Sequence, residues 1–196
     1  MLFFEQYPIR NYSAHMSDTE LFEFCVANQE LRIERDADQN ILIMAPVGGG
    51  SGFYEKDFIT DIEIWVRQTK LGISFSSSTG FLLPNGAMRS PDASWLSDEK
   101  WQSLTAEQKQ GFIPLVPDFV VEVRSPTDSL KRLRNKMLEW IEQGVHLGWL
   151  IDPVENQALI YRENGSIAII EGLEAILTGE EVMPGFEFDL NRLRLP

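Results

Sequence analysis

The sequence has few of the residues that form disulfides or bind zinc. Its 196 residues include one cysteine, Cys25, and two histidines, His15 and His146. A single cysteine excludes an intramolecular disulfide framework and indicates a reducing compartment. The two histidines lack the spacing of zinc ligands, so each is expected in the core or at the surface.

Several patterns that specify a location or a reaction class are also missing. No run of about 18 apolar residues could span a membrane, and Glu5 and Arg10 interrupt the apolar start that a signal peptide needs. We therefore expect a cytoplasmic protein with no membrane segment. The sequence GGGSG at 48–52 is not followed by GK[ST], which argues against a phosphate loop. The absence of GxSxG excludes the nucleophile elbow of α/β hydrolases.

Positive charge is scarce in the chain but concentrated locally. There are 17 Lys and Arg against 30 Asp and Glu, a formal net charge of −13. Such a chain has no general attraction for nucleic acid, because that affinity comes from neutralising phosphates. Five basic residues nevertheless lie close together: Arg124, Lys131, Arg132, Arg134 and Lys136. This stripe either binds a polyanion or forms an ordinary solvated helix face.

The order of predicted elements favours an α/β fold. The length favours one domain, in which residues 1–47 form an N-terminal helix and hairpin and residues 48–196 form the core. The patterns predict helices from about 17, over 54–70 and over 129–143, and a flexible joint at 48–52. They predict strands at 31–35, 41–47, 116–125 and 145–152, and hairpins that turn at 84–86 and 163–165. Residues 95–110 are expected as a loop or short helix. A mixed sheet flanked by helices fits this order best.

The strand at 116–125 carries unusual charges for a core element. Strand side chains alternate, so Asp118, Glu122 and Arg124 share one face. Glu122 and Arg124 are about 6.6 Å apart along the strand. The two side chains either contact a metal-bound water or a phosphate, or form a structural ion pair with each other. Asp118 lies roughly 13 Å from Glu122 and is expected to fix the start of the strand or a turn.

Three further charged residues are candidates for the same site. If the strand of Asp92 pairs beside that of Glu122, both carboxylates can hold one Mg²⁺ or Mn²⁺ ion. Glu55 lies near the centre of the apolar face of the helix at 54–70, with Glu63 on its flank. Glu55 either points into the site or complements the helix dipole. Lys136 lies on the flank of the helix at 129–143, and either extends outward or leans towards the carboxylates.

Three stretches, 72–101, 112–153 and 181–190, closely resemble the Uma family of endonucleases in the PD-(D/E)xK superfamily. The similarity extends from residue 48 to the C-terminus. It implies a restriction-endonuclease-like core and Mg²⁺-dependent phosphodiester cleavage. By the family motif, Asp92 is the first acid, Glu122 the second, Arg124 the position that is usually Lys, and Lys136 the basic residue of the following helix. Glu55 lies near the place where the superfamily often has an acid from its first core helix.

Arg124 departs from the family motif and leaves two functions open. Arginine stays protonated and cannot activate water, so either Lys136 takes that role or the protein binds without cutting. The first hypothesis is a metal-dependent DNA endonuclease that acts as a homodimer and pairs through the hairpin at 158–170. The second is a catalytically inactive nucleic-acid-binding or assembly module on the same fold, which the charge of −13 favours.

Overall fold

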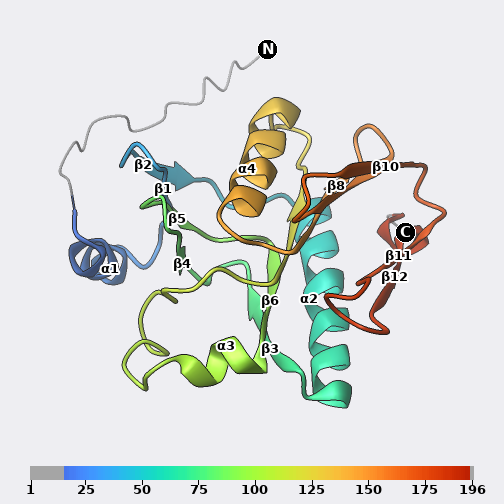
Figure 1. Ribbon diagram of the computed structural model, residues 1–196. Coiled ribbons are helices and arrows are strands. Elements are labelled where there is room, and N and C mark those ends of the chain that lie inside the picture. Colours follow the sequence, from blue (N-terminus) through green and yellow to red (C-terminus); the bar gives the residue numbers. More distant parts are fainter. Residues whose placement is uncertain (1–15, 195–196) are drawn as a thin grey trace, which may run out of the picture.

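A mixed six-stranded sheet forms the centre of the molecule, as a computed structural model of residues 16–194 shows (Figure 1). His15 and the start of the chain lie outside the described residues. The strand order is β10-β9-β8-β7-β6-β3. Its strands are β3 (Gly72–Ser76), β6 (Ala93–Ser97), β7 (Phe119–Val123), β8 (Leu147–Asp152), β9 (Gln157–Arg162) and β10 (Ile167–Glu171). The predicted fold class is confirmed.

Helix α4 (Leu130–Glu142) connects the two parallel strands of this sheet. β7 pairs with β8 in parallel, whereas the other neighbouring strands pair antiparallel. A parallel connection needs a long crossover, and a helix is its usual form. The predicted succession of strand, helix, strand and hairpin from residue 116 to 170 is therefore confirmed.

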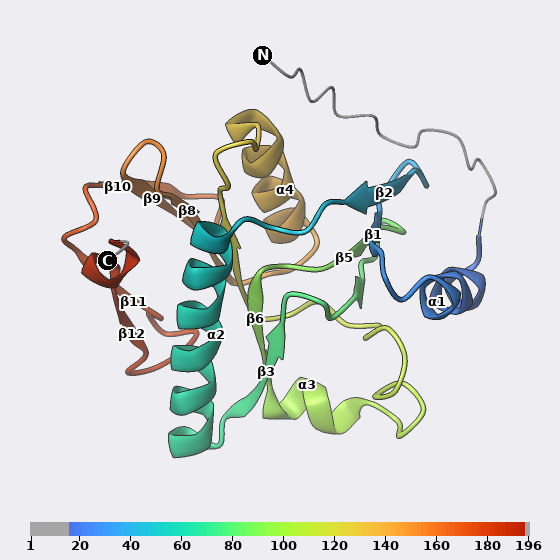
Figure 2. The same ribbon diagram turned by 180° about the vertical axis from the view of Figure 1, so that it is seen from behind.

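Helices α2 (Gly49–Thr69) and α4 cover opposite faces of the sheet, and Figure 2 shows α2 lying along it. Phe119 and Val121 of β7 pack on the side of α2, and Val120 packs on the side of α4. The alternation predicted for this strand therefore divides two apolar cores. The tail packs against the first core through β11 (Ile176–Thr178), β12 (Glu187–Asp189) and η1 (Leu190–Leu193).

A smaller sheet with the order β2-β1-β5-β4 joins the N-terminal hairpin to the rest of the chain. It contains β1 (Arg32–Arg35), β2 (Ile41–Met44), β4 (Phe81–Leu82) and β5 (Met88–Arg89), with α1 (Asp18–Ala27) packed beside it. β1 pairs with β2 along its length and with β5 at Arg35 and Met88. The predicted capping box of Ser17 and Glu20 begins α1.

Two predictions about the central segment need correction. The predicted hairpin at 84–86 forms, but each of its long strands is divided between the two sheets, as β3 and β4 and as β5 and β6. A turn at Ser76 and Thr79 ends β3, and Pro91, which has no N–H to donate, separates β5 from β6. Residues 98–103 form the short helix α3 (Asp98–Ser103), while Trp95 belongs to β6.

The predicted flexible joint at 48–52 is wrong, because α2 begins at Gly49. Glycine costs a helix about 1 kcal/mol relative to alanine. Burial of the large side chains Phe58, Ile62 and Trp65 on the same helix outweighs this cost. None of the described helices is long and apolar enough to cross a membrane.

Candidate active site

Asp92 and Glu122 meet where β6 begins and β7 ends. The two strands pair antiparallel, with Ala93 opposite Val121, so the condition on which the two acids can share one cation is met. Asp92 Oδ2 accepts a hydrogen bond of 2.7 Å from the backbone N–H of Val123. Glu122 is only 3% exposed, whereas Asp92 is partly exposed. The pair is therefore buried on the strand side and reachable by solvent at Asp92.

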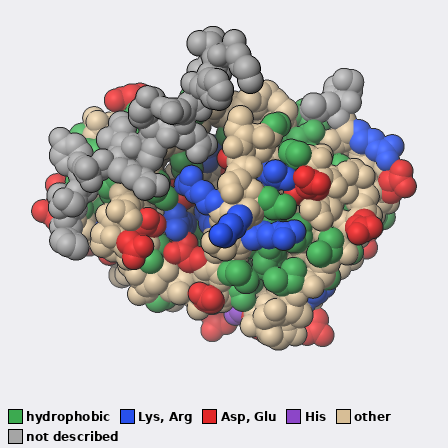
Figure 3. Space-filling model, turned by 90° about the horizontal axis from the view of Figure 1, so that it is seen from above, with side chains coloured by type: hydrophobic (Ala, Val, Ile, Leu, Met, Phe, Trp, Pro, Cys, Tyr) green, Lys and Arg blue, Asp and Glu red, His purple; other side chains and the backbone are tan. Residues whose placement is uncertain are grey.

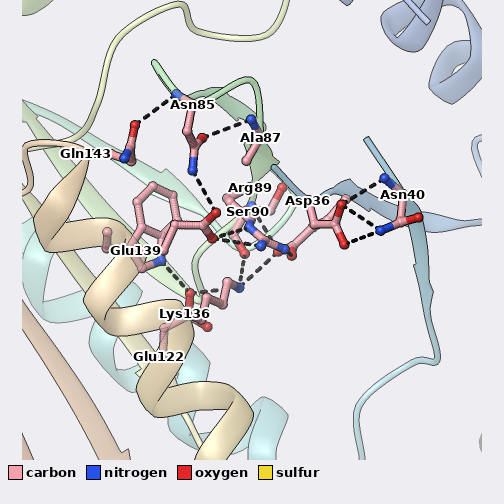
Figure 4. A network of polar contacts seen from close by, with 12 residues as sticks. Asp36, Asn40, Asn85, Ala87, Arg89, Ser90, Glu122, Lys136, Glu139 and Gln143 are labelled. Carbon is pink, nitrogen blue, oxygen red and sulfur yellow. Dashed lines mark hydrogen bonds and ion pairs between the residues drawn. The ribbon is translucent and has the colours of Figure 1, made fainter. Parts of the chain in front are cut away.

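Helix α4 supplies two partners for Glu122 (Figure 4). Lys136 Nζ lies 2.8 Å from Glu122 Oε1, and Trp140 Nε1 donates to the same oxygen at 3.0 Å. Lys136 and Trp140 are four residues apart, so they share one face of the helix. Of the two orientations left open for Lys136, the structure has the one that leans towards the carboxylates.

Glu34 of β1 completes the surroundings of Lys136 and was not predicted from the sequence. Glu34 Oε1 lies 2.9 Å from Lys136 Nζ and accepts a hydrogen bond of 3.1 Å from Ser90 N. Glu34 Oε2 lies 3.1 Å from Nη1 of Arg89, which also pairs with Glu139 at 2.7 Å. The local pattern of the hairpin gives no sign that it packs on the core, so no signal in the sequence identifies Glu34.

Glu55 of α2 approaches the same carboxylates. Its side chain is buried, with only 7% of the residue exposed. Burial raises the pKa of Glu55. The charge of Arg32 and a hydrogen bond with Ser77 lower this pKa, and the charge of Glu122 raises it further. Of the two alternatives for Glu55, pointing into the site or complementing the helix dipole, the structure favours the first. Glu63 instead pairs with Arg67 at 2.6 Å and accepts a hydrogen bond from Ser74.

Burial and the charges of neighbouring carboxylates make the two central acids weak. Burial raises the pKa of Asp92 to about 6, with a further rise from Glu55, although Lys136 opposes both. Burial raises the pKa of Glu122 to about 7; Lys136 lowers it, while Asp92 and Glu34 raise it. Strongly raised acidic pKa values with specific charged neighbours are more frequent at functional sites than elsewhere.

Glu34 and Lys136 show the opposite behaviour. Burial alone would raise the pKa of Glu34, but Lys136 and Arg89 outweigh it and lower the pKa below its usual value. Burial would lower the pKa of Lys136, but Glu122, Glu34 and Asp92 raise it above its usual value. Lys136 therefore stays a cation at neutral pH.

Arg124 does not join this cluster. Its Nη1 lies 3.0 Å from Asp152 Oδ2, a fully buried carboxylate at the end of β8, and 3.7 Å from Glu155. The alternative of an ion pair between Glu122 and Arg124 is therefore wrong. Glu122 pairs with Lys136, and Arg124 pairs with Asp152.

Asp118 lies at the opposite end of β7. Its Oδ2 accepts a hydrogen bond of 2.7 Å from Ser97 N, and its Oδ1 pairs with Lys100 at 2.7 Å. His146 Nδ1 also approaches Oδ1 at 3.3 Å. These contacts connect β7 to β6 and to α3, so Asp118 fixes the start of the strand as predicted.

The basic stripe divides between the interior and the surface. Lys131 and Arg132 at the start of α4 are exposed, Arg134 is partly exposed, and Lys136 turns inward. Figure 3 shows the molecule from above, relative to the view of Figure 1. Lys and Arg side chains gather on one part of the face that this view shows, with Asp and Glu side chains around them.

The donor set fits a hard divalent cation that keeps part of its water. Among residues 16–194, no group of three or more His, Cys, Asp and Glu is placed to hold a metal. Two carboxylates are present, however, and the second oxygen of Asp92, Oδ1, accepts no hydrogen bond within the described chain. Mg²⁺ commonly binds one or two carboxylates and retains several waters. Asp92 and Glu122 would hold such an ion.

Comparison with known proteins supports the fold and gives the family. The chain is similar to a putative nuclease from Anabaena variabilis whose crystal structure superimposes with a TM-score of 0.69, at 19% identity over 82% of this chain and 88% of that one. At this identity the similarity shows the fold alone. No curated protein matches the chain. The model of the Uma2 family, described as "Putative restriction endonuclease", matches residues 18–191. Because this match covers almost the whole chain, the protein belongs to the Uma2 family.

Proposed function

We propose that this protein is a Mg²⁺-dependent endonuclease that hydrolyses phosphodiester bonds of DNA. The observation that carries the proposal is the convergence of Asp92, Glu122 and Lys136 from three separate elements. Burying two carboxylates with raised pKa values beside an ammonium group costs folding energy, so their presence in one place is more easily explained by chemistry than by stability. Family membership supports the reaction class.

Each side chain has a distinct role in this proposal. Asp92 and Glu122 hold the cation, which when bound neutralises the phosphate and lowers the pKa of a water molecule. Lys136 is protonated, so it stabilises negative charge on the phosphate and does not act as a base. Glu55, whose pKa is raised and whose charge acts on both acids, would take up the proton that the attacking water releases.

The exposed start of α4 is the proposed contact with the DNA backbone. Lys131 and Arg132 are exposed there and lie on the same helix as Lys136. Two cations supply only a weak attraction for a polyanion, and the net charge of the chain opposes it. We therefore expect weak binding whose logarithm falls with the logarithm of the salt concentration with a slope of only about −2.

The test is plasmid cleavage by the wild-type protein and by Glu122→Gln in Mg²⁺ or Mn²⁺. Glutamine keeps an oxygen for the hydrogen bond from Trp140 but removes the charge that holds the cation. We expect the wild type to nick supercoiled DNA and Glu122→Gln to lose at least about 100-fold in rate.

Glu63→Gln is the matched control, because Glu63 is also a glutamate next to the sheet but pairs with Arg67 away from the site. It should cleave as the wild type does. Equal nicking by the wild type and Glu122→Gln would reveal a contaminating nuclease. Binding of DNA without any cleavage would favour the inactive binding module instead.

A further inference from the structure

The carboxylate of Glu34 is fully engaged although it comes from outside the six-stranded sheet. It is 1% exposed and lies on β1, in the small N-terminal sheet. One oxygen contacts Lys136 Nζ at 2.9 Å and Ser90 N at 3.1 Å, and the other contacts Arg89 at 3.1 Å. The hairpin thus supplies a buried anion next to the proposed site.

Lys136 in turn has three acceptors for its three N–H donors. Nζ lies 2.8 Å from Glu122 Oε1, 2.9 Å from Glu34 Oε1 and 3.3 Å from the carbonyl oxygen of Ser90. An ammonium group has three donors and no acceptor. Figure 4 shows these contacts between the helix and the strands that face it. The position of Nζ is therefore defined by all three oxygens together.

A divalent cation would change only one of these contacts. Glu122 is one of the two proposed ligands of the cation, so the cation and Lys136 compete for the charge of the same carboxylate. Glu34 and the carbonyl oxygen of Ser90 do not belong to the proposed ligand set. They remain available to Lys136 when the charge of Glu122 is shared.

A purely structural role explains these contacts poorly. Burying a charged pair contributes little net stability, because desolvation offsets the attraction between the charges. Glu34 also has Arg89 as a partner, which by itself would satisfy one carboxylate oxygen. The second contact of Glu34 is with Lys136, and it fixes the position of an ammonium group that belongs to the proposed active site.

We propose that Glu34 is a positioning residue that retains the ammonium group of Lys136 beside Asp92 and Glu122 when a divalent cation occupies these two acids. This inference rests on the proposed function, because it assumes the cation site. In the absence of Glu34, Glu122 is the only anionic partner left to Lys136 at hydrogen-bond distance among residues 16–194, and Lys136 competes more strongly with the cation.

The experiment is calorimetric titration of the full chain with MnCl₂ for four proteins: the wild type, Glu34→Gln, Lys136→Met and the double variant. Lys136→Met removes the competing cation, so Mn²⁺ should bind about tenfold more tightly. Glu34→Gln should weaken binding about tenfold in the wild-type background. In the Lys136→Met background it should weaken binding less than about threefold, because only the loss of its own negative charge remains.

An equal loss from Glu34→Gln in both backgrounds would overturn the positioning role, because Glu34 would then act on the cation without Lys136. If Glu34→Gln does not fold, Glu34→Asp replaces it and should weaken binding by an intermediate factor that again depends on Lys136. Glu139→Gln is the control, since Glu139 pairs with Arg89 in the same network but does not contact Lys136. Its Mn²⁺ affinity should match that of the wild type.

The titration also separates this inference from the proposed function. The dependence on Lys136 is measured by binding, so it decides the role of Glu34 whether or not the plasmid is cut. Absence of Mn²⁺ binding in both the wild type and Lys136→Met would overturn the cation site and the positioning role together.

Discussion

The charges of individual residues at the site work against folding at neutral pH. Asp92 and Glu122 both have raised pKa values, of about 6 and about 7. A group whose pKa is higher in the folded than in the unfolded protein binds more protons when folded. The free energy of unfolding therefore falls as the pH rises from about 4 to about 7, where the unfolded chain is already ionised. This loss is typical of sites in which stability is reduced for function.

Replacing Asp92 by Asn should therefore stabilise the metal-free protein at pH 8. The change removes a buried carboxylate that repels Glu55 and Glu122, while the amide oxygen can still accept the hydrogen bond from Val123 N. We expect a gain of about 1–3 kcal/mol at pH 8 and a much smaller gain at pH 5, where Asp92 is largely protonated. Thermal unfolding at both pH values measures it, at about 2–4 °C per kcal/mol for a chain of this size.

Asp38→Asn provides the control for net charge, because Asp38 is exposed and the change in formal charge is the same. Its melting temperature should move little between the two pH values. A stabilisation by Asp92→Asn that is equal at pH 5 and pH 8 would show that repulsion between ionised acids is not its cause.

At the scale of elements, the sequence predicted correctly those helices, strands and turns whose form depends on residues close together in the chain. The alternation in β7, the helical spacing in α4 and the turn at Gly165 depend on short stretches, and the structure confirms all three. The start of α2 could not be predicted, because the packing of Phe58 and Ile62 against distant strands overrides the glycines. Glu34 could not be predicted for the same reason, since its partner Lys136 is 102 positions away.

The end of β7 gives a prediction about Arg124. Its guanidinium group connects this strand to Asp152 at the end of β8, where 14% of the arginine side chain and none of the aspartate side chain is exposed. Arg124→Ala leaves a buried carboxylate whose remaining donors are backbone N–H groups and Gln157. We expect a loss of about 1–3 kcal/mol in the free energy of unfolding, with Mn²⁺ affinity unchanged. Chemical denaturation and calorimetry measure the two quantities.

Arg67→Ala is the matched control, because Arg67 pairs with Glu63 at the surface and its side chain is 77% exposed. Such pairs contribute at most about 1 kcal/mol, so its stability should change little. A tenfold loss of Mn²⁺ affinity in Arg124→Ala at an unchanged melting temperature would instead place Arg124 in the site.

At the scale of the whole molecule, the two edges of the large sheet differ. β3 forms one edge, and α2 and α3 both pack against it. β10 forms the other edge, and within the described residues no further strand pairs with its outer side. Ile167 and Ile169 on this strand are 47% and 54% exposed. Edge strands without lysine or proline tend to pair with another chain, and β10 has neither.

We therefore propose a homodimer in which β10 pairs with the same strand of a second copy, as a two-fold axis permits. Ile169→Lys should abolish it by introducing a charge at the edge, whereas Ile64→Lys should not, although Ile64 on α2 is similarly exposed at 48%. Light scattering at micromolar concentration measures the mass. Each copy carries a formal charge of −13, so repulsion opposes the apolar contact, and salt that screens it should favour the dimer. A monomeric wild type at high salt would exclude this pairing. If Ile169→Lys and Ile64→Lys had the same mass, the interface would not involve β10.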